Sequence, residues 1–193
     1  MSALAGITSV YAEALATNPV ATQSLTAALT FALSDVTAQL LDRSTTTEAP
    51  QCDGPRVFTT ALIGLLYFGP ALFYYLDFIT SLIPGSDLAS VLLKTVCGQL
   101  GFGPLLTCVF FASFLVKDFG VAAGLAQLPR KIRQDLLKTW ASELCFWPFV
   151  DLICYGLVPV AFIPLGYNVA NFVWTIFLSL QAARKVAGER RRS

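Results

Sequence analysis

The sequence predicts an all-α protein, namely a polytopic membrane helix bundle with about five spanning or membrane-embedded helices. Hydrophobic residues make up 55% of the 193 residues, and only 13% are charged. A soluble domain normally carries about 25% charged residues, so there is too little polar surface here to cover a globule in water. The mean hydropathy of +0.66 agrees with this deficit. The apolar residues also occur in runs long enough to cross a bilayer.

Five apolar stretches are predicted, and they make residues 1–193 a single integral membrane domain. The stretches are Val20–Leu41, Val57–Ile83, Leu88–Val116, Thr139–Val160 and Leu165–Ala183. Each has the length of a spanning helix, about 17 to 25 residues, or somewhat more. The four residues from Pro84 to Asp87 leave room only for a tight hairpin turn between the second and third stretches. Prolines inside the stretches are expected to kink the helices, because neighbouring helices can satisfy the carbonyls that proline leaves free.

The basic residues support five crossings rather than four. Residues 117–138 carry Arg130, Lys131 and Arg133, and we expect a loop there that leads into a short basic amphipathic helix at the membrane surface. Residues 184–193 form a basic C-terminal tail. With five crossings, twelve of the thirteen Lys and Arg residues fall on one side. The positive-inside rule then places the C-terminus in the cytosol or matrix. A re-entrant corner at Pro159 and Pro164 is the alternative.

Several functional classes are excluded by what the sequence lacks. It contains no histidine, no glycine-rich phosphate loop and no C-x-x-C pair among its five cysteines. Histidine is the commonest metal ligand and the usual general base near neutral pH. We therefore expect no enzymatic activity, no metal or other cofactor and no nucleic-acid partner. The first nineteen residues carry no Lys or Arg, so neither a secretory signal nor a transit peptide is expected.

Polar side chains inside the predicted spans are the candidate functional residues. A charge near the bilayer centre costs about 2.5 to 3.5 kcal/mol on insertion scales, so such residues pair, line water or approach an interface. The candidate pore-lining residues are Asp35, Gln39, Gln99 and Asp151. Asp151 has no basic residue at its depth and should line water or carry a proton. For Asp35, Gln39 and Gln99, helix packing is the alternative to a pore.

A predicted intramembrane ion pair joins the second and third stretches. Asp77 lies six residues before Ile83, and Lys94 lies six residues after Leu88. The two side chains would therefore reach a similar depth on adjacent helices of the hairpin. A structural ion pair that locks the hairpin is the first interpretation, and a role in conduction is the alternative.

An ordered series of proline, glycine, tryptophan and asparagine residues runs through nearly the whole chain. Its members are Pro19, Gly69, Pro70, Pro104, Trp147, Pro148, Pro159, Asn168 and Trp174. At these positions the chain resembles the Mpv-seventeen / peroxisomal membrane protein of twenty-two kilodaltons family. The C-terminal pattern of that family is W-P, Q, N-F, V-P, R, N and W-x-x-Y-L-S at the same spacing. This chain departs from the pattern at Asp151, where the family has glutamine, and at Cys154, where it has asparagine.

The resemblance implies a small integral protein of the mitochondrial inner membrane, with the peroxisomal membrane as the alternative. It also implies a channel or pore for small solutes that contributes to the metabolite balance of the organelle. A non-conducting scaffold or assembly protein of the same membrane is the alternative function. The expected partners are the lipid bilayer and small solutes, and a homo-oligomer is allowed. The series of nine residues is then expected to be structural.

Overall fold

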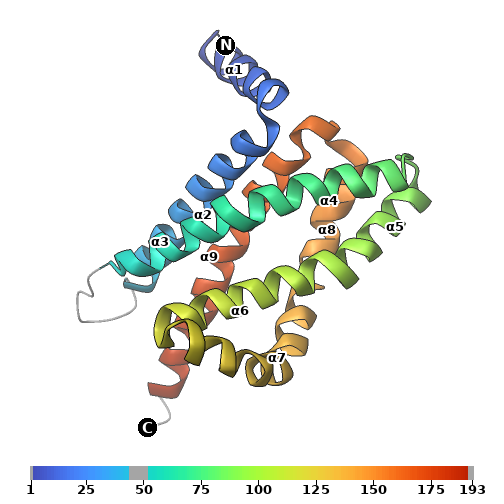
Figure 1. Ribbon diagram of the computed structural model, residues 1–193. Coiled ribbons are helices and arrows are strands. Elements are labelled where there is room, and N and C mark those ends of the chain that lie inside the picture. The colour runs from blue at the N-terminus through green and yellow to red at the C-terminus, as the bar shows by residue number, and fades with distance from the viewer. Residues whose placement is uncertain (1, 44–51, 191–193) are drawn as a thin grey trace.

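The computed structural model describes residues 2–43 and 52–190, and its regular elements are all helical (Figure 1). Side chains are described over residues 9–41 and 52–177. The elements are α1 (Ser2–Thr17), α2 (Pro19–Arg43), α3 (Gly54–Ile63), η1 (Gly64–Phe68), α4 (Gly69–Leu82), α5 (Leu88–Cys97), η2 (Gly98–Phe102), α6 (Gly103–Phe119), α7 (Val121–Glu143), α8 (Trp147–Leu157), η3 (Val160–Phe162) and α9 (Ile163–Arg190). The predicted all-α membrane bundle is confirmed.

The chain passes back and forth along the bundle (Figure 1). The first three passes are α2, then α3 continued through η1 into α4, then α5 continued through η2 into α6; α8 and α9 make the last two. Four segments are apolar and long enough to cross a membrane, namely Pro19–Leu41, Gly54–Leu82, Leu88–Phe119 and Val160–Phe177. The pass along α8 has only 11 helical residues, which is about 16 Å of helix. Helix α8 is therefore shorter than a spanning helix of about 17 to 25 residues, and of the five predicted crossings the described residues provide four that are long enough.

The predicted fourth stretch is wrong at its start. Residues 139–143 belong to α7, a helix of 23 residues, and α8 begins only at Trp147. Pro148 explains the break, because it lies in the first turn of α8 and has no N–H for a carbonyl of the preceding turn. The predicted short surface helix is thus longer than expected, and it lies at the end of the bundle where α6 ends (Figure 1).

The hairpin between α4 and α5 forms as predicted. Asp87 caps α5 by accepting hydrogen bonds from the Ser90 N–H at 3.2 Å and the Ser90 hydroxyl at 2.6 Å. The hydroxyl bond holds the pKa of Asp87 below its usual value, because it stabilises the carboxylate. The cap explains why α5 begins at Leu88.

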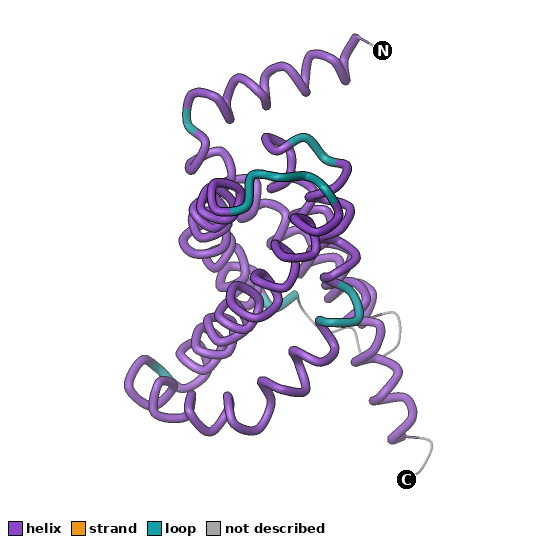
Figure 2. The backbone as a smooth tube through the Cα atoms, turned by 90° about the vertical axis from the view of Figure 1, so that its right-hand side faces the viewer, coloured by secondary structure: helices purple, strands orange, loops and turns teal. Residues whose placement is uncertain are grey.

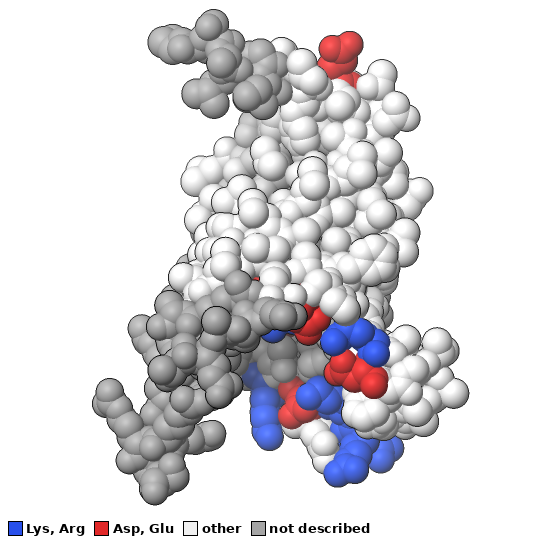
Figure 3. Space-filling view, turned by 90° about the vertical axis from the view of Figure 1, so that its left-hand side faces the viewer, with Lys and Arg blue, Asp and Glu red and all other residues white. Residues whose placement is uncertain are grey.

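The two ends of the bundle differ in charge. In the face drawn in Figure 3, the Lys and Arg side chains gather at the lower end, and a broad uncharged surface covers the middle. Leu29, Leu66 and Leu100 expose more than half of their side chains on the outside of the bundle, as lipid-facing residues do. Of the predicted basic tail, residues 184–190 continue α9, and residues 191–193 lie outside the described residues.

Helix α1 was not predicted, and it lies at the end opposite to the basic residues. Figure 2 shows it crossing over that end of the bundle, while α9 leads to the C-terminus at the other end. Pro19 begins α2 directly after it, at the first helical position where proline needs no hydrogen bond. The hydroxyl of Thr22 in α2 donates to the Ala14 carbonyl at 3.0 Å and ties the two helices together.

Two π-helical turns with the same sequence pattern interrupt the second and third passes. The pattern G-x-x-x-F-G-P occurs at residues 64–70 and again at 98–104. In each turn the glycine directly before the proline donates its N–H to the carbonyl of the glycine five residues earlier. These bonds join Gly69 to Gly64 and Gly103 to Gly98. The proline that follows has no N–H to donate, and the wider turn accommodates this loss. The kinks predicted at Pro70 and Pro104 therefore take the form of π-helical turns.

Candidate functional site

Asp151 of α8 lies at the centre of a buried polar cluster, with only 3% of its surface exposed. The Gln99 amide donates to Asp151 Oδ2 at 2.8 Å. The Tyr167 hydroxyl donates to Asp151 Oδ1 at 2.5 Å. Each carboxylate oxygen therefore has one donor, from η2 and from α9 respectively. The structure brings together two of the predicted pore-lining residues, Gln99 and Asp151, and surrounds Asp151 with protein rather than an open water-filled lumen.

The π-helical turn η2 positions Gln99 and leaves its carbonyl free for a side chain. The Gly103 N–H donates to Gly98, and Pro104 has no N–H, so the Gln99 carbonyl lacks a backbone donor. The indole N–H of Trp140 in α7 supplies the missing hydrogen bond at 2.8 Å. Gln99 thus links η2 to two other helices, because its carbonyl accepts a hydrogen bond from α7 and its side chain donates one to α8.

The predicted ion pair between Asp77 and Lys94 is wrong. The Lys94 ammonium instead donates to the Gly85 carbonyl in the hairpin turn at 2.7 Å. Asp77 is exposed, and none of the ion pairs among the described side chains includes it. The buried face of α4 carries Leu72, Leu76 and Ile79, so Asp77 points to another side of that helix. Equal depth on adjacent helices was therefore not sufficient for contact.

Lys94 is buried against the interior of the bundle, with 4% of its surface exposed. Its ammonium lies 5.5 Å from the centroid of the Tyr155 ring, a distance at which a cation interacts with an aromatic face. Tyr155 and Asp151 are one turn apart on α8, so their side chains lie on the same face. Tyr75 also approaches this region, where its hydroxyl lies 3.5 Å from the Lys94 carbonyl.

These contacts, together with the shared face of Asp151 and Tyr155 on α8, form a series that we call the polar track. Its members are Lys94, Tyr155, Asp151, Gln99 and Trp140. One end is tied to the hairpin turn at Gly85, and the other end is tied to α7. The track therefore runs from the hairpin turn to η2 in the middle of the third pass, where the C-terminal part of α7 reaches it.

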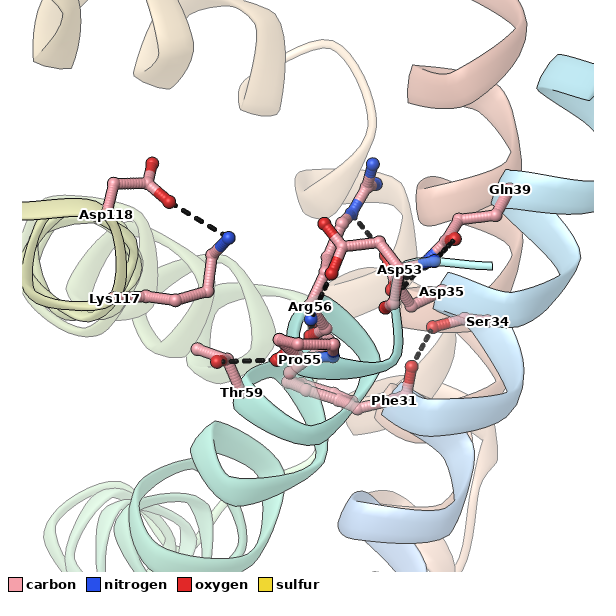
Figure 4. A network of polar contacts seen from close by, with 11 residues as sticks. Phe31, Ser34, Asp35, Gln39, Asp53, Pro55, Arg56, Thr59, Lys117 and Asp118 are labelled. Atoms are coloured by element: carbon pink, nitrogen blue, oxygen red, sulfur yellow. Dashed lines mark hydrogen bonds and ion pairs between the residues drawn. The ribbon is translucent and has the colours of Figure 1, made fainter. Parts of the chain in front are cut away.

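The other two predicted pore-lining residues belong to a separate cluster (Figure 4). The Asp35 carboxylate, of which 4% is exposed, pairs with the Arg56 guanidinium at 2.9 Å. Gln39 donates to the same carboxylate at 2.8 Å and accepts from the Asp53 N–H at 2.8 Å. This cluster fastens the end of α2 to the start of α3. Among the described residues, no hydrogen bond or ion pair joins it to the polar track.

Several residues of the family-like series support helix packing around α8 and α9. Trp174 stacks on Phe146 with ring centroids 5.1 Å apart, and its centroid lies 6.3 Å from that of Trp147. The Asn168 amide donates to the Pro164 carbonyl at 2.9 Å. Pro159 precedes η3 in the corner between the two helices. These positions thus fix how the last two passes meet.

A cavity of about 320 Å³ lies between α1, α4 and the corner before α9. Its lining includes Asp77, Gln23 and Thr80 among mostly apolar side chains. The sequence did not predict this cavity, because no helix was expected before Pro19. Asp77, predicted to pair with Lys94, has no ion pair among the described side chains.

The apolar outer surface, the long helices and the segregated charges define an integral polytopic helical membrane protein. Residues 122–179 match the Mpv17 / PMP22 family. The chain is 30% identical to Protein SYM1 of Gibberella zeae over 175 residues, which cover 88% of this chain and 93% of that protein. The chain belongs to the Mpv17 / PMP22 family, as the resemblance in the sequence implied.

Other relatives extend the comparison. The chain is 29% identical to the mitochondrial inner membrane protein Mpv17 of Bos taurus, over 90% of this chain and 96% of that protein. It is 24% identical to PXMP2/4 family protein 4 of Dictyostelium discoideum, over 88% of this chain and 89% of that protein. No solved structure matches the chain.

Proposed function

We propose that this protein forms a pore for small solutes and contributes to the metabolite balance of an organelle. The mitochondrial inner membrane is the proposed location, because a relative with 29% identity is named for that membrane. The peroxisomal membrane is the alternative. The polar track is the observation that carries the proposal. Ionisable groups within a bilayer are costly, and they commonly mark the routes of ions and solutes.

The composition of the track favours a route over simple packing. Lys94 and Asp151 are both buried, yet they form no ion pair with each other in the described structure. Tyr155 lies between them. Packing alone is achieved elsewhere in the bundle by apolar residues, such as Ala27 and Phe31 of α2 against Phe68 of η1. Two separate buried ionisable groups at one helix interface therefore suit a path for polar solutes.

The described conformation is the closed state of the proposed pore. Tyr155 and Tyr167 are buried in the interface, and Asp151 holds η2 and α9 together through its two hydrogen bonds. Opening requires α8 to separate from η2, which breaks the contact between Asp151 and Gln99. A π-helical turn suits such a movement, because these turns recur at functional sites within helices.

Recordings of the purified protein in planar bilayers test the proposal. The wild type should conduct, and it should prefer cations if Asp151 faces the open path. Asp151→Gln restores the residue typical of the family and should reduce the cation preference while the protein still conducts. Asp118→Asn is the matched control, because this exposed carboxylate pairs with Lys117 outside the track. No current from the wild type, or equal selectivity in all three proteins, would contradict the proposal.

A non-conducting scaffold is the second proposal, and the hydrogen bonding of Asp151 favours it. Both carboxylate oxygens already have donors, so the cluster is suited to lock helices as it stands. On this proposal the wild type passes no current, and Asp151→Gln changes only the melting temperature. Neither proposal includes a catalytic step.

A further inference from the structure

The cavity beside α1 has the composition of a ligand-binding site. Its volume of about 320 Å³ lies within the range of small-molecule pockets, about 300 to 1,000 Å³. Most of the lining is apolar and includes Leu15, Phe73 and Phe162. A few polar groups among apolar walls are typical of sites that orient a ligand.

Asp77 gives this cavity a negative charge that the protein leaves uncompensated. No Lys or Arg lines the cavity, and no ion pair of the described side chains includes Asp77. The nearby Thr80 hydroxyl donates its proton to the Leu76 carbonyl at 2.6 Å. The Thr80 oxygen therefore remains able to accept a hydrogen bond, as the Asp77 carboxylate does. Both groups present acceptors to whatever fills the space.

Gln23 provides an independent indication of a ligand. It lines the cavity from α2, and only 7% of its surface is exposed. Its amide oxygen is buried and has no hydrogen-bond partner among the described residues. Buried polar groups in proteins are nearly always hydrogen-bonded, so an orphaned amide calls for a partner from outside the chain. Gln23 thus contributes an unpaired acceptor to the wall of the cavity that Asp77 and Thr80 also line.

We propose that this cavity binds a small organic cation, namely a primary ammonium attached to a compact apolar body. The ammonium has three donors, which match the acceptors of Asp77, Thr80 and Gln23. The apolar body packs against the hydrophobic walls. A bare metal ion fits less well, because Ca²⁺ takes about six to eight oxygen ligands and Mg²⁺ about six in near-octahedral geometry. The binding site does not depend on whether the polar track conducts.

Phenethylammonium is a suitable probe, because it combines a primary ammonium with an aromatic body. Its binding to the full chain in phosphatidylcholine nanodiscs can be followed by isothermal titration calorimetry, with empty nanodiscs subtracted. The wild type should show one saturable site. Neutral 2-phenylethanol, which has nearly the same size, should bind at least about tenfold more weakly, since it lacks the charge that Asp77 attracts.

Three variants complete the test. Asp77→Asn removes the carboxylate, and Ala161→Phe fills the cavity from η3; each should weaken phenethylammonium binding at least about tenfold. Glu13→Gln removes an exposed negative charge of α1 that does not line the cavity, and it should leave the affinity unchanged. The proposal is overturned by unchanged binding in Asp77→Asn, by an equal loss in Glu13→Gln, or by no saturable heat in the wild type. Equilibrium binding involves no current, so a failure here is distinct from a failure of the pore.

Discussion

The turns η1 and η2 share a sequence pattern and a backbone geometry, yet the protein uses them differently. At η1, a Cβ on Gly64 would lie 2.8 Å from the Ala27 carbonyl carbon, and one on Gly69 would lie 2.8 Å from the Ser24 nitrogen. The glycines of η1 thus bring two helix backbones together. At the equivalent glycines of η2, a Cβ on Gly103 would lie 3.7 Å from the Gly98 carbonyl oxygen, and one on Gly98 would lie 2.9 Å from the Tyr75 hydroxyl. The neighbours of this second turn are polar side chains rather than the backbone of another helix.

The second position of the pattern explains the difference. It is Leu65 in η1 and Gln99 in η2. The proline leaves a carbonyl without a backbone donor in both turns, but only at η2 do the described contacts include a side-chain donor, Trp140. The same π-helical turn therefore allows close helix packing in η1, where its neighbours are small. In η2 it forms a polar junction, where it contacts a tryptophan and a carboxylate.

The largest expected loss of stability comes from substitutions that disrupt the close packing at η1. Gly69→Ala and Gly64→Ala place a methyl group against the backbone of α2, and overpacking of this kind costs about 3 kcal/mol where the neighbour is backbone. Gly103→Ala is the matched change in η2, where the added methyl group would lie 3.7 Å from the Gly98 carbonyl oxygen, and it should be neutral or slightly stabilising, since alanine favours helix. Reversible unfolding in mixed micelles of dodecyl maltoside and sodium dodecyl sulfate measures all three. Equal losses at the three positions would remove the distinction between the turns.

An intermediate effect tests the free carbonyl at η2. Trp140→Phe leaves the Gln99 carbonyl without its donor, which should lower the free energy of unfolding by about 2 kcal/mol. Pro104→Ala restores a backbone N–H next to that carbonyl, so Trp140→Phe should cost less in a Pro104→Ala background.

The control for this rescue uses the other turn. Pro70→Ala restores an N–H at η1, far along the chain from Trp140, and should not change the cost of Trp140→Phe. The same unfolding assay applies. A rescue by Pro70→Ala as large as that by Pro104→Ala would show that proline removal stabilises the helices generally.

The smallest expected effect concerns the cluster that anchors the pass containing η1. Arg56→Met leaves the buried Asp35 carboxylate with Gln39 as its remaining partner, and we expect a loss of about 1 kcal/mol. Lys117→Met breaks an exposed pair with Asp118 near the end of the pass containing η2, and no measurable loss is expected. If both changes leave the melting temperature unaltered, the cluster around Asp35 does not stabilise the junction of α2 and α3.

The fold was largely predictable because long apolar runs in a sequence indicate membrane spans. The hairpin was predictable as well, since Pro84 and Gly85 leave no room for another structure. The end of α7 was not, because Thr139 and Trp140 are as compatible with a span as with a surface helix. The break depends on Pro148, and it is visible only once α8 is known to begin at Trp147.

The site was predictable in its residues and not in their grouping. Asp35, Gln39, Gln99 and Asp151 were all identified as polar groups within spans, but depth along a helix does not determine the direction of a side chain. Asp35 and Gln39 bind each other in the cluster with Arg56, and Gln99 and Asp151 bind each other in the polar track. The repeated G-x-x-x-F-G-P pattern was a signal in the sequence that would have drawn attention to Gln99, because it marks where a carbonyl loses its backbone donor.

The hydrogen bond between Lys94 and Gly85 has a consequence for how the protein enters the membrane. From residue 57 to residue 116 the charged side chains are Asp77, Asp87 and Lys94, so the turn can be carried across the bilayer with few charges. Lys94 is the only cation of this segment, and its ammonium is bound by the turn of its own hairpin. We therefore expect α5 to enter the membrane with the turn already folded against it, because an open turn would leave this ammonium without its partner during biogenesis.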